Sequence, residues 1–188
     1  MMGIYDIRDM ALRSRRAVYS AQQLANLIGK PKPVATVYLS RLVAKGLAKK
    51  LLRGRITFVE DDHIIASQLV EPAYISLMSA LAFHNLVQQV PARVECVSPK
   101  NSRKYEKLGV IYHKIPASFF YGYERHWKGS SYVLVADPEK ALLDALYLNR
   151  IGENAAKELL GKMDRQRLAG YVRRFHGKGK KKLERWLL

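Results

Sequence analysis

Cysteine is nearly absent from this chain, and long apolar runs are absent altogether. Cys96 is the single cysteine among 188 residues, so an intrachain disulfide is excluded and a reducing, cytoplasmic location is expected. No run of apolar residues approaches the roughly 18 that a membrane span requires. The N-terminus also has no apolar core of the signal-peptide kind, and we therefore expect no membrane association.

The side-chain patterns of metal and covalent catalysis are missing too. No two of the five histidines are three to five residues apart, and a lone cysteine adds little to a zinc site. The sequence has no phosphate-binding glycine loop, no G-x-S-x-G elbow and no H-E-x-x-H motif. Asp137-Pro138-Glu139-Lys140 is close to a magnesium-dependent nuclease motif, but that motif has one residue between the acid and the lysine. We expect neither an enzyme nor a protein with a cofactor or bound metal.

Acidic residues are scarce relative to basic ones. The chain has 33 Lys and Arg against 16 Asp and Glu, which gives a formal net charge of +17. Residues 1–66 and 151–188 each carry a net charge of +7, whereas residues 67–150 carry only +3. Such an excess indicates a polyanionic partner, with nucleic acid favoured over an anionic membrane surface. The two basic ends are expected to face that partner.

Residues 19–58 have the order of elements of a winged helix-turn-helix. Ser20 and Gln23 match the capping-box pattern that opens a helix. The Lys30-Pro31-Lys32-Pro33 run after Gly29 ends that helix, because the residue before a proline avoids the α region. A second helix is predicted over residues 33–45, with Pro33 in its first turn.

The second helix has one apolar face and one open face when it is projected at 100° per residue. On the open face, Arg41 is suited to guanine O6 and N7, and Val37 and the Thr36 methyl group are suited to a thymine methyl. Ser40 is suited to a base or a phosphate. The residues of this face predicted to contact DNA are Pro33, Thr36, Val37, Ser40 and Arg41.

Two strands around a glycine turn, residues 47–52 and 55–59, predict a basic hairpin after the second helix. Its side chains and the lysines beside the helix are suited to phosphates or to the minor groove. The residues predicted to bind the DNA backbone are Lys30, Lys32, Lys45, Lys49, Lys50, Arg53 and Arg55. The alternative interpretation is a module used only for protein contact, whose charges are merely solvated.

The whole chain is predicted to have an α+β fold, in which the winged helix-turn-helix occupies residues 1–66. A small mixed α/β domain follows at 71–150, and a helical, basic C-terminal extension at 151–188. The predicted strands of the middle domain are residues 93–97, 110–115, 122–127 and 132–135. The other predicted helices are residues 4–16, 63–70, 75–86, a helix opened by Asp137-Pro138-Glu139, and residues 155–163 and 165–175. Residues 176–182 are expected to be a flexible basic linker.

Two further features have both a structural and a functional interpretation. His84, near the end of an apolar helix, is expected to be packed or to cap that helix rather than to act on a ligand. Phe119, Phe120, Tyr121 and Tyr123 can stack on single-stranded bases. Because these four aromatic residues surround a glycine and lie beside predicted strands, we expect them to belong to the core instead.

Three motifs follow the winged segment in a fixed order: Tyr-Ile-Ser-Leu at 74–77, Phe-Tyr-Gly-Tyr at 120–123 and Asp-Pro-Glu-Lys-Ala-Leu-Leu-Asp at 137–144. In this order they resemble the AbiEi-type antitoxins, which are also described as transcriptional regulators of viral defence systems. The resemblance covers roughly residues 15–150. The chain departs from the family in its short C-terminal region and its Lys-rich tail.

The resemblance implies a DNA-binding domain that represses its own operon through repeated operator sequences, with its DNA-binding helix at residues 33–45. It also implies a second domain that neutralises a nucleotidyltransferase-type toxin. We therefore expect a sequence-specific regulator of double-stranded DNA, and two copies on one operator that meet through the nearly neutral middle domain. A protein-interaction antitoxin that holds a toxin is the alternative, and an RNA-binding protein is a third hypothesis.

Overall fold

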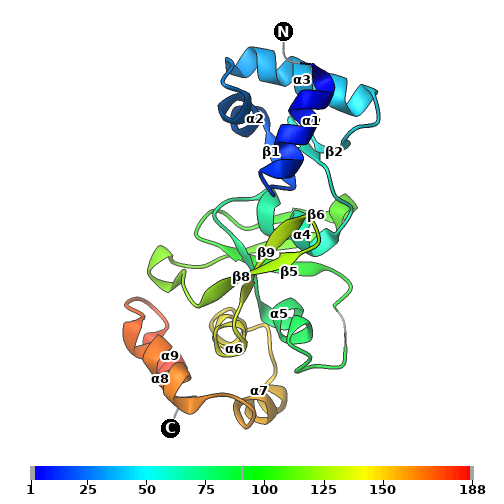
Figure 1. The fold of residues 1–188 in the computed structure, drawn as a ribbon. Coiled ribbons are helices and arrows are strands. Elements are labelled where there is room, and N and C mark those ends of the chain that lie inside the picture. The colour runs from blue at the N-terminus through cyan, green and yellow to red at the C-terminus, as the bar shows by residue number, and fades with distance from the viewer. Residues whose placement is uncertain (1–2, 90, 187–188) are drawn as a thin grey trace. The chain divides into compact units, whose positions relative to one another are not determined.

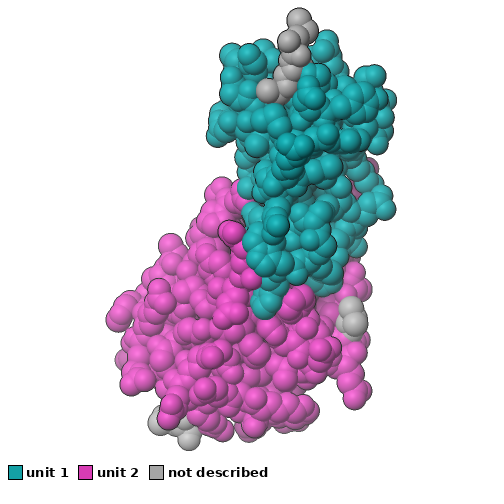
Figure 2. Space-filling view, in the orientation of Figure 1, with its two compact units in different colours: residues 1–69, 126–133 teal, residues 70–125, 134–188 magenta. Residues whose placement is uncertain are grey.

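The computed structural model describes residues 3–89 and 91–186 (Figure 1). Within this part of the chain the fold is mixed α+β with two sheets, so the expected class is confirmed. The contacts divide the chain into two compact units (Figure 2). Unit 1 comprises residues 1–69 and 126–133, and unit 2 comprises residues 70–125 and 134–188. None of the described helices is long and apolar enough to cross a membrane.

Unit 1 begins with three helices and a three-stranded sheet. The helices are α1 (Ile4–Arg13), α2 (Ala21–Ile28) and α3 (Lys32–Ala44), and α4 (Asp62–Leu69) ends the first segment of the unit. The sheet is antiparallel, in the order β1-β3-β2. Its strands are β1 (Val18–Ser20), β2 (Lys49–Leu52) and β3 (Arg55–Thr57).

Local sequence signals fix the ends of α2 and α3. The Ser20 hydroxyl accepts the Gln23 N–H at 3.2 Å, and the Gln23 carboxamide oxygen accepts the Ser20 N–H at 2.8 Å, so the predicted capping box is confirmed. Gly29 then adopts φ 61°, a left-handed conformation that a glycine adopts without strain. Helix α3 begins at Lys32, one residue before the predicted start, with Pro33 in its first turn.

The core of unit 1 is built from the inner faces of these helices and from the sheet. Helix α2 packs against both α1 and α3. The fully or almost fully buried side chains of this core include Ile7, Ala11, Tyr19, Leu24, Ala35, Leu39, Leu42 and Ile56. The predicted first helix is shorter than expected, because the chain after Arg13 turns into β1, which pairs with β3.

A hairpin tip from much later in the sequence, residues 126–133, completes unit 1. The Gln68 carboxamide joins the two segments: its oxygen accepts the Ala17 N–H at 2.8 Å, and its nitrogen donates to the Ser131 hydroxyl at 3.0 Å. The Ser131 hydroxyl in turn donates to the Arg15 carbonyl at 2.7 Å. Unit 1 is therefore discontinuous in sequence, which the sequence patterns did not indicate.

Unit 2 is built on a mixed six-stranded sheet in the order β6-β7-β5-β4-β9-β8. Strand β5 is parallel to β7 and antiparallel to β4, which in turn is parallel to β9. The strands are β4 (Tyr74–Ile75), β5 (Val94–Ser98), β6 (Arg103–Tyr105), β7 (Val110–Lys114), β8 (Tyr123–Lys128) and β9 (Ser131–Ala136). Their last two members also contribute the hairpin tip of unit 1.

The helices of unit 2 gather around α6. Helix α5 packs against β5 and α6, and α6 also contacts the three helices that follow it (Figure 1). The bounds are α5 (Leu77–Phe83), α6 (Pro138–Tyr147), α7 (Glu153–Leu160), α8 (Arg165–Arg174) and α9 (Lys180–Glu184). The two short 3-10 helices are η1 (Glu106–Leu108) and η2 (Ala117–Phe119). The predicted helix at 75–86 is shorter than expected, because Ile75 pairs with Cys96 and Val135 as part of the sheet.

The expectation of a flexible linker at residues 176–182 is wrong for residues 180–182, which are helical. Helix α9 begins within this segment, and the Leu183 side chain is fully buried. The Lys182 ammonium donates to the Leu146 carbonyl and to the Asn149 side chain, each at 2.5 Å. A cation at the C-terminal end of α6 is favourable, since the last carbonyls of a helix have no partner within it.

A buried ion pair lies at the centre of unit 2. Lys140 and Asp144 are both fully buried, and the Lys140 ammonium donates to the Asp144 carboxylate one helical turn away. The other Asp144 oxygen accepts hydrogen bonds from the Tyr74 hydroxyl at 3.1 Å and the Ser76 hydroxyl at 2.6 Å. These bonds compensate the loss of hydration that burial of a carboxylate entails.

Aromatic rings enclose the cation of this pair. The Lys140 nitrogen lies 3.6 Å from the centre of the Phe119 ring and 5.4 Å from that of Tyr121, within cation–π range. Gly122 leaves room for the Lys140 stem, because a Cβ at this position would lie 2.9 Å from the lysine Cγ. With φ +73°, the Gly122 backbone also favours glycine.

We predict that Lys140→Met destabilises unit 2 by about 3–5 kcal/mol, because it leaves the Asp144 carboxylate buried without its counter-charge. Burial raises the pKa of Asp144 and lowers that of Lys140, so each charge depends on the other. Native-state hydrogen exchange of the α6 amides measures the effect on unit 2 itself.

The double variant Lys140→Met/Asp144→Asn should lose less stability than the single one, since it removes both charges and keeps a side chain that accepts hydrogen bonds. Lys157→Met is the matched control, because Lys157 belongs to an exposed ion pair with Glu153. An equal effect of Lys140→Met and Lys157→Met on α6 exchange would contradict the central role of the buried pair.

Candidate nucleic-acid interface

Helix α3 presents one face to the core of unit 1 and the opposite face to solvent. Ala35, Leu39 and Leu42 are 0%, 4% and 0% exposed. On the other side, Val37 is 50% exposed, and Arg41 is also exposed. The division into an inner and an outer face that the sequence predicted is therefore confirmed for these residues.

All twelve residues predicted for DNA contact lie on the surface of unit 1. Arg55 is partly buried, and the other eleven are exposed. On or beside α3 lie Lys30, Lys32, Pro33, Thr36, Val37, Ser40, Arg41 and Lys45. On the β2–β3 hairpin lie Lys49, Lys50, Arg53 and Arg55.

A hollow of about 490 Å³ lies between α3 and the β2–β3 hairpin. It brings residues of the two predicted contact elements together, since Thr36 and Ser40 line its helical side while Arg53 and Arg55 line its hairpin side. Leu39 and Ile56 form part of its wall. A concave surface bordered by an exposed helix and a basic hairpin can accommodate the edge of a DNA groove and the phosphates beside that edge.

The hydroxyl groups on α3 are bonded within the helix. The Thr36 hydroxyl donates to the Lys32 carbonyl at 2.9 Å, and the Ser40 hydroxyl donates to the Thr36 carbonyl at 3.3 Å. In this conformation each offers a ligand only its acceptor lone pairs. A base amino group is therefore a better partner for Ser40 than a phosphate, which is itself an acceptor.

The charge around the hollow is of one sign. Residues 10–59 contain eleven Lys and Arg but no Asp or Glu. Within the described part of unit 1, one of the predicted contact residues has an acidic partner: Lys49 lies 3.9 Å from Glu60, and both side chains are largely exposed. Such an exposed pair is weak. The surface therefore keeps its positive field, which attracts a polyanion and speeds its association.

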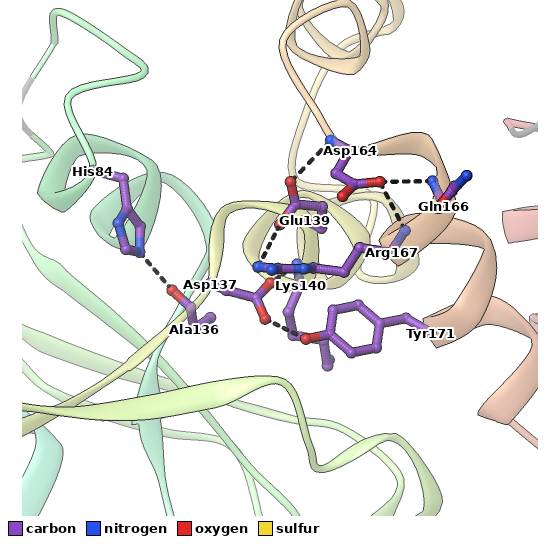
Figure 3. Close-up of polar contacts among 9 residues, drawn as sticks. All are labelled: His84, Ala136, Asp137, Glu139, Lys140, Asp164, Gln166, Arg167 and Tyr171. Atoms are coloured by element: carbon purple, nitrogen blue, oxygen red, sulfur yellow. Dashed lines mark hydrogen bonds and ion pairs between the residues drawn. The ribbon is translucent and has the colours of Figure 1, made fainter.

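The carboxylates of unit 2 that invited a nuclease interpretation are engaged in structural contacts (Figure 3). The Asp137 carboxylate accepts the Lys140 N–H at 2.8 Å and also a hydrogen bond from the Tyr171 hydroxyl. Glu139 accepts the Asp164 N–H at 3.0 Å. Among the described residues, no group of three His, Cys, Asp or Glu side chains could hold a metal ion.

His84 is packed at the end of its helix, as the sequence predicted. It ends α5, and its Nε2 lies 2.8 Å from the Ala136 carbonyl oxygen (Figure 3). This hydrogen bond ties the end of α5 to the last residue of β9. The contact was not predictable from sequence, because the two residues are far apart along the chain.

The three sequence motifs that carry the family resemblance all meet at the buried ion pair of unit 2. The first supplies Tyr74 and Ser76, and the last supplies Lys140 and Asp144. The middle motif supplies Gly122, against which the Lys140 stem packs. Each motif therefore has a packing role in this structure, and Lys140 was not expected among the buried residues.

No protein-family model matches this chain, and no curated protein matches its sequence. The resemblance to the AbiEi-type antitoxins thus rests on the three motifs and on their order. Every function inferred from it stays a prediction.

We predict that Arg41→Ala weakens binding to a preferred DNA sequence by about 1–3 kcal/mol and relaxes the preference at one base position. The reason is the loss of a side chain that can form two hydrogen bonds with one guanine. Fluorescence titration of the preferred and single-base-changed duplexes measures both effects. The fold should stay intact, because Arg41 is exposed and Leu42 carries the packing. Unchanged affinity in a folded variant would contradict this docking of α3.

Replacement of both Arg53 and Arg55 by alanine should weaken binding to all duplex sequences alike. The slope of log K against log salt concentration should fall by about 0.9 for each phosphate that the variant no longer neutralises. Binding titrations over a salt series give this slope for the variant and for the unaltered protein. Arg125→Ala/Arg150→Ala is a matched control, because both arginines are exposed residues of unit 2 and neither lines the hollow. A collapse of sequence preference at an unchanged slope would mean that the hairpin contacts bases instead.

Proposed function

We propose that this protein is a sequence-specific, double-stranded DNA-binding transcriptional regulator, and that α2, α3 and the β2–β3 hairpin act as a winged helix-turn-helix. One observation carries the proposal: the exposed face of α3 and a basic hairpin border a single hollow in a stretch without acidic residues. The helix offers Val37 and Arg41 to base edges, and the surrounding lysines and arginines neutralise phosphates.

The outer face of α3 supports DNA as the partner over another protein. A protein interface has a core rich in aromatic side chains, whereas the outer face of α3 exposes two valines, Val34 and Val37, beside short polar side chains and one arginine. Thr36, Ser40 and Ala44 allow the helix backbone to come close to base edges. This combination fits insertion of the N-terminal half of α3 into a major groove.

We further propose that the protein represses its own operon, and this part of the proposal rests on the family resemblance. In such an arrangement the operator lies upstream of the gene for this chain, and the bound protein excludes the transcription machinery. The same resemblance supports the alternative that the protein also neutralises a nucleotidyltransferase-type toxin. Co-expression with a toxin of that class, with cell growth as the readout, separates this activity from DNA binding.

Selection from a random duplex library with the full chain tests the proposal. A regulator of this kind enriches a consensus and binds it about 10³-fold or more tightly than random duplex at the same salt concentration. The Arg41→Ala variant serves as the control, since it should keep the fold and enrich a consensus that is relaxed at one base position. Enrichment of no consensus by the unaltered protein would contradict sequence-specific binding.

We further predict that two copies occupy one operator, because a single helix-turn-helix contacts a short half-site and repressors gain specificity from paired half-sites. Footprinting at saturating protein should then show two protected half-sites with cooperative occupancy. Protection of one half-site of about 10 base pairs, without cooperativity, would indicate that the protein acts as a monomer.

A further inference from the structure

The positive charge of unit 2 is concentrated in its last two helices. Residues 165–185 contain nine Lys and Arg and a single acidic residue, Glu184. The rest of unit 2 contains eleven Lys and Arg and ten Asp and Glu, so it is almost neutral. This segment lies outside the part of the chain that resembles the AbiEi-type antitoxins.

Helix α8 is held on the start of α6 by several contacts from its own side chains and from the residue before it (Figure 3). The Tyr171 hydroxyl donates to Asp137, and the Asp164 N–H donates to Glu139 at 3.0 Å. The Arg167 guanidinium also lies 3.6 Å from the second Glu139 oxygen. These contacts fix the orientation of α8 relative to α6.

Helix α9 is fixed in the same way, through the buried Leu183 side chain and the Lys182 ammonium at the end of α6. Its start lies beside the end of α8, because the Lys180 ammonium donates to the Arg173 carbonyl at 3.2 Å. The basic side chains of the two helices are thus carried by neighbouring, packed elements rather than by a free tail.

Most basic side chains of the α8–α9 surface have no ion-pair partner among the described contacts. Across residues 165–185, as far as the structure describes side-chain contacts, Arg167 is the one basic residue with an ion-pair partner. The exposed basic residues are Arg165, Arg167, Arg173, Arg174, Lys178, Lys181 and Arg185. Cations fixed close together repel one another, and this repulsion is relieved when a regular polyanion binds across them.

The surroundings of these cations favour duplex DNA over other polyanions. The exposed large apolar side chains of the described residues are Tyr5, Leu12, Val34, Val37 and Trp127, all of which belong to unit 1. Among the described residues, the basic surface therefore has no exposed large apolar side chain to anchor a protein interface or a bilayer, and Tyr171 and Trp186 are partly buried. The described part of this surface also has no exposed Phe, Tyr or Trp on which unpaired bases could stack.

We propose that α8 and α9 form a second, sequence-independent binding surface for the phosphate backbone of duplex DNA. Its role is to increase affinity and association rate for any duplex, while α3 supplies the choice of sequence. This inference rests on the proposed function, since it takes DNA as the partner of the chain.

The test uses the full chain with Arg173, Lys178, Lys181 and Arg185 all replaced by Gln. Affinity for a random-sequence duplex is measured by fluorescence anisotropy between about 50 and 200 mM salt. Binding should weaken at least about tenfold at the lowest salt, and the slope of log K against log salt should fall by about 0.9 for each phosphate left without a bound cation. The consensus selected from the library should stay the same.

A matched control replaces Lys100, Lys107, Lys114 and Arg150 by Gln, all of which are exposed residues of unit 2. It lowers the net charge by the same amount but leaves the α8–α9 surface intact. Equal loss of affinity in both variants would overturn the inference, because overall charge alone would then explain the binding. Melting temperatures of both variants report on folding, and since only exposed side chains change, we expect them to match the unaltered protein.

Two further results would overturn the inference. One is that the unaltered protein binds duplex DNA and the α8–α9 variant binds it with the same affinity and salt slope. This result would leave the proposed function intact. The other is a selective loss of binding to poly-glutamate with DNA binding retained, which would assign the surface to an acidic protein. If the unaltered protein binds no duplex at all, both the inference and the proposed function fail.

Discussion

The ion pair between Lys140 and Asp144 is the interaction on which unit 2 depends. Two opposite charges without access to water are stable only when their remaining hydrogen-bonding groups are satisfied. Here β4 and the residue after it supply the hydroxyls, and the segment before β8 supplies the aromatic rings. A strand, a loop and a helix must therefore all be in place for the pair to form, which couples their packing.

The same helix connects this core to the basic surface of the C-terminal helices. The first turn of α6 holds α8 through Asp137 and Glu139, and its last carbonyls receive Lys182 next to α9. Burial raises the pKa of Asp137, as expected for a carboxylate removed from water. The placement of cations on the surface of unit 2 is thus determined by the polar groups at both ends of one buried helix.

Local signals in the sequence predicted much of unit 1 and part of unit 2. The Ser20 and Gln23 capping box and the proline-rich break located α2 and α3 to within a residue, because these signals act within one helical turn. Strands β1, β4 and β6 were not predicted, since two or three residues are too short to have a period. The accessibility of the candidate DNA-binding residues followed from helical projection, but the hollow beside the hairpin required the fold.

The burial of Lys140 and the ordering of residues 180–184 could not be predicted for a different reason. A Lys and an Asp four residues apart normally indicate an exposed pair on a helix surface, and a run of lysines normally indicates a solvated segment. Both patterns are overruled by neighbours distant in sequence, namely Tyr74 for the first and Leu146 for the second. Such contacts leave no periodic trace in the sequence.

The hairpin tip at residues 126–133 has a consequence for the order of events during synthesis. The ribosome completes residues 1–69 before it makes the hairpin tip that joins them through Gln68 and Ser131. Most of the sheet of unit 2 is translated in the interval, which lasts on the order of seconds at ordinary elongation rates. A nascent or prematurely terminated chain that ends before residue 126 therefore lacks a complete unit 1, and the complete unit exists only in chains that already carry most strands of unit 2.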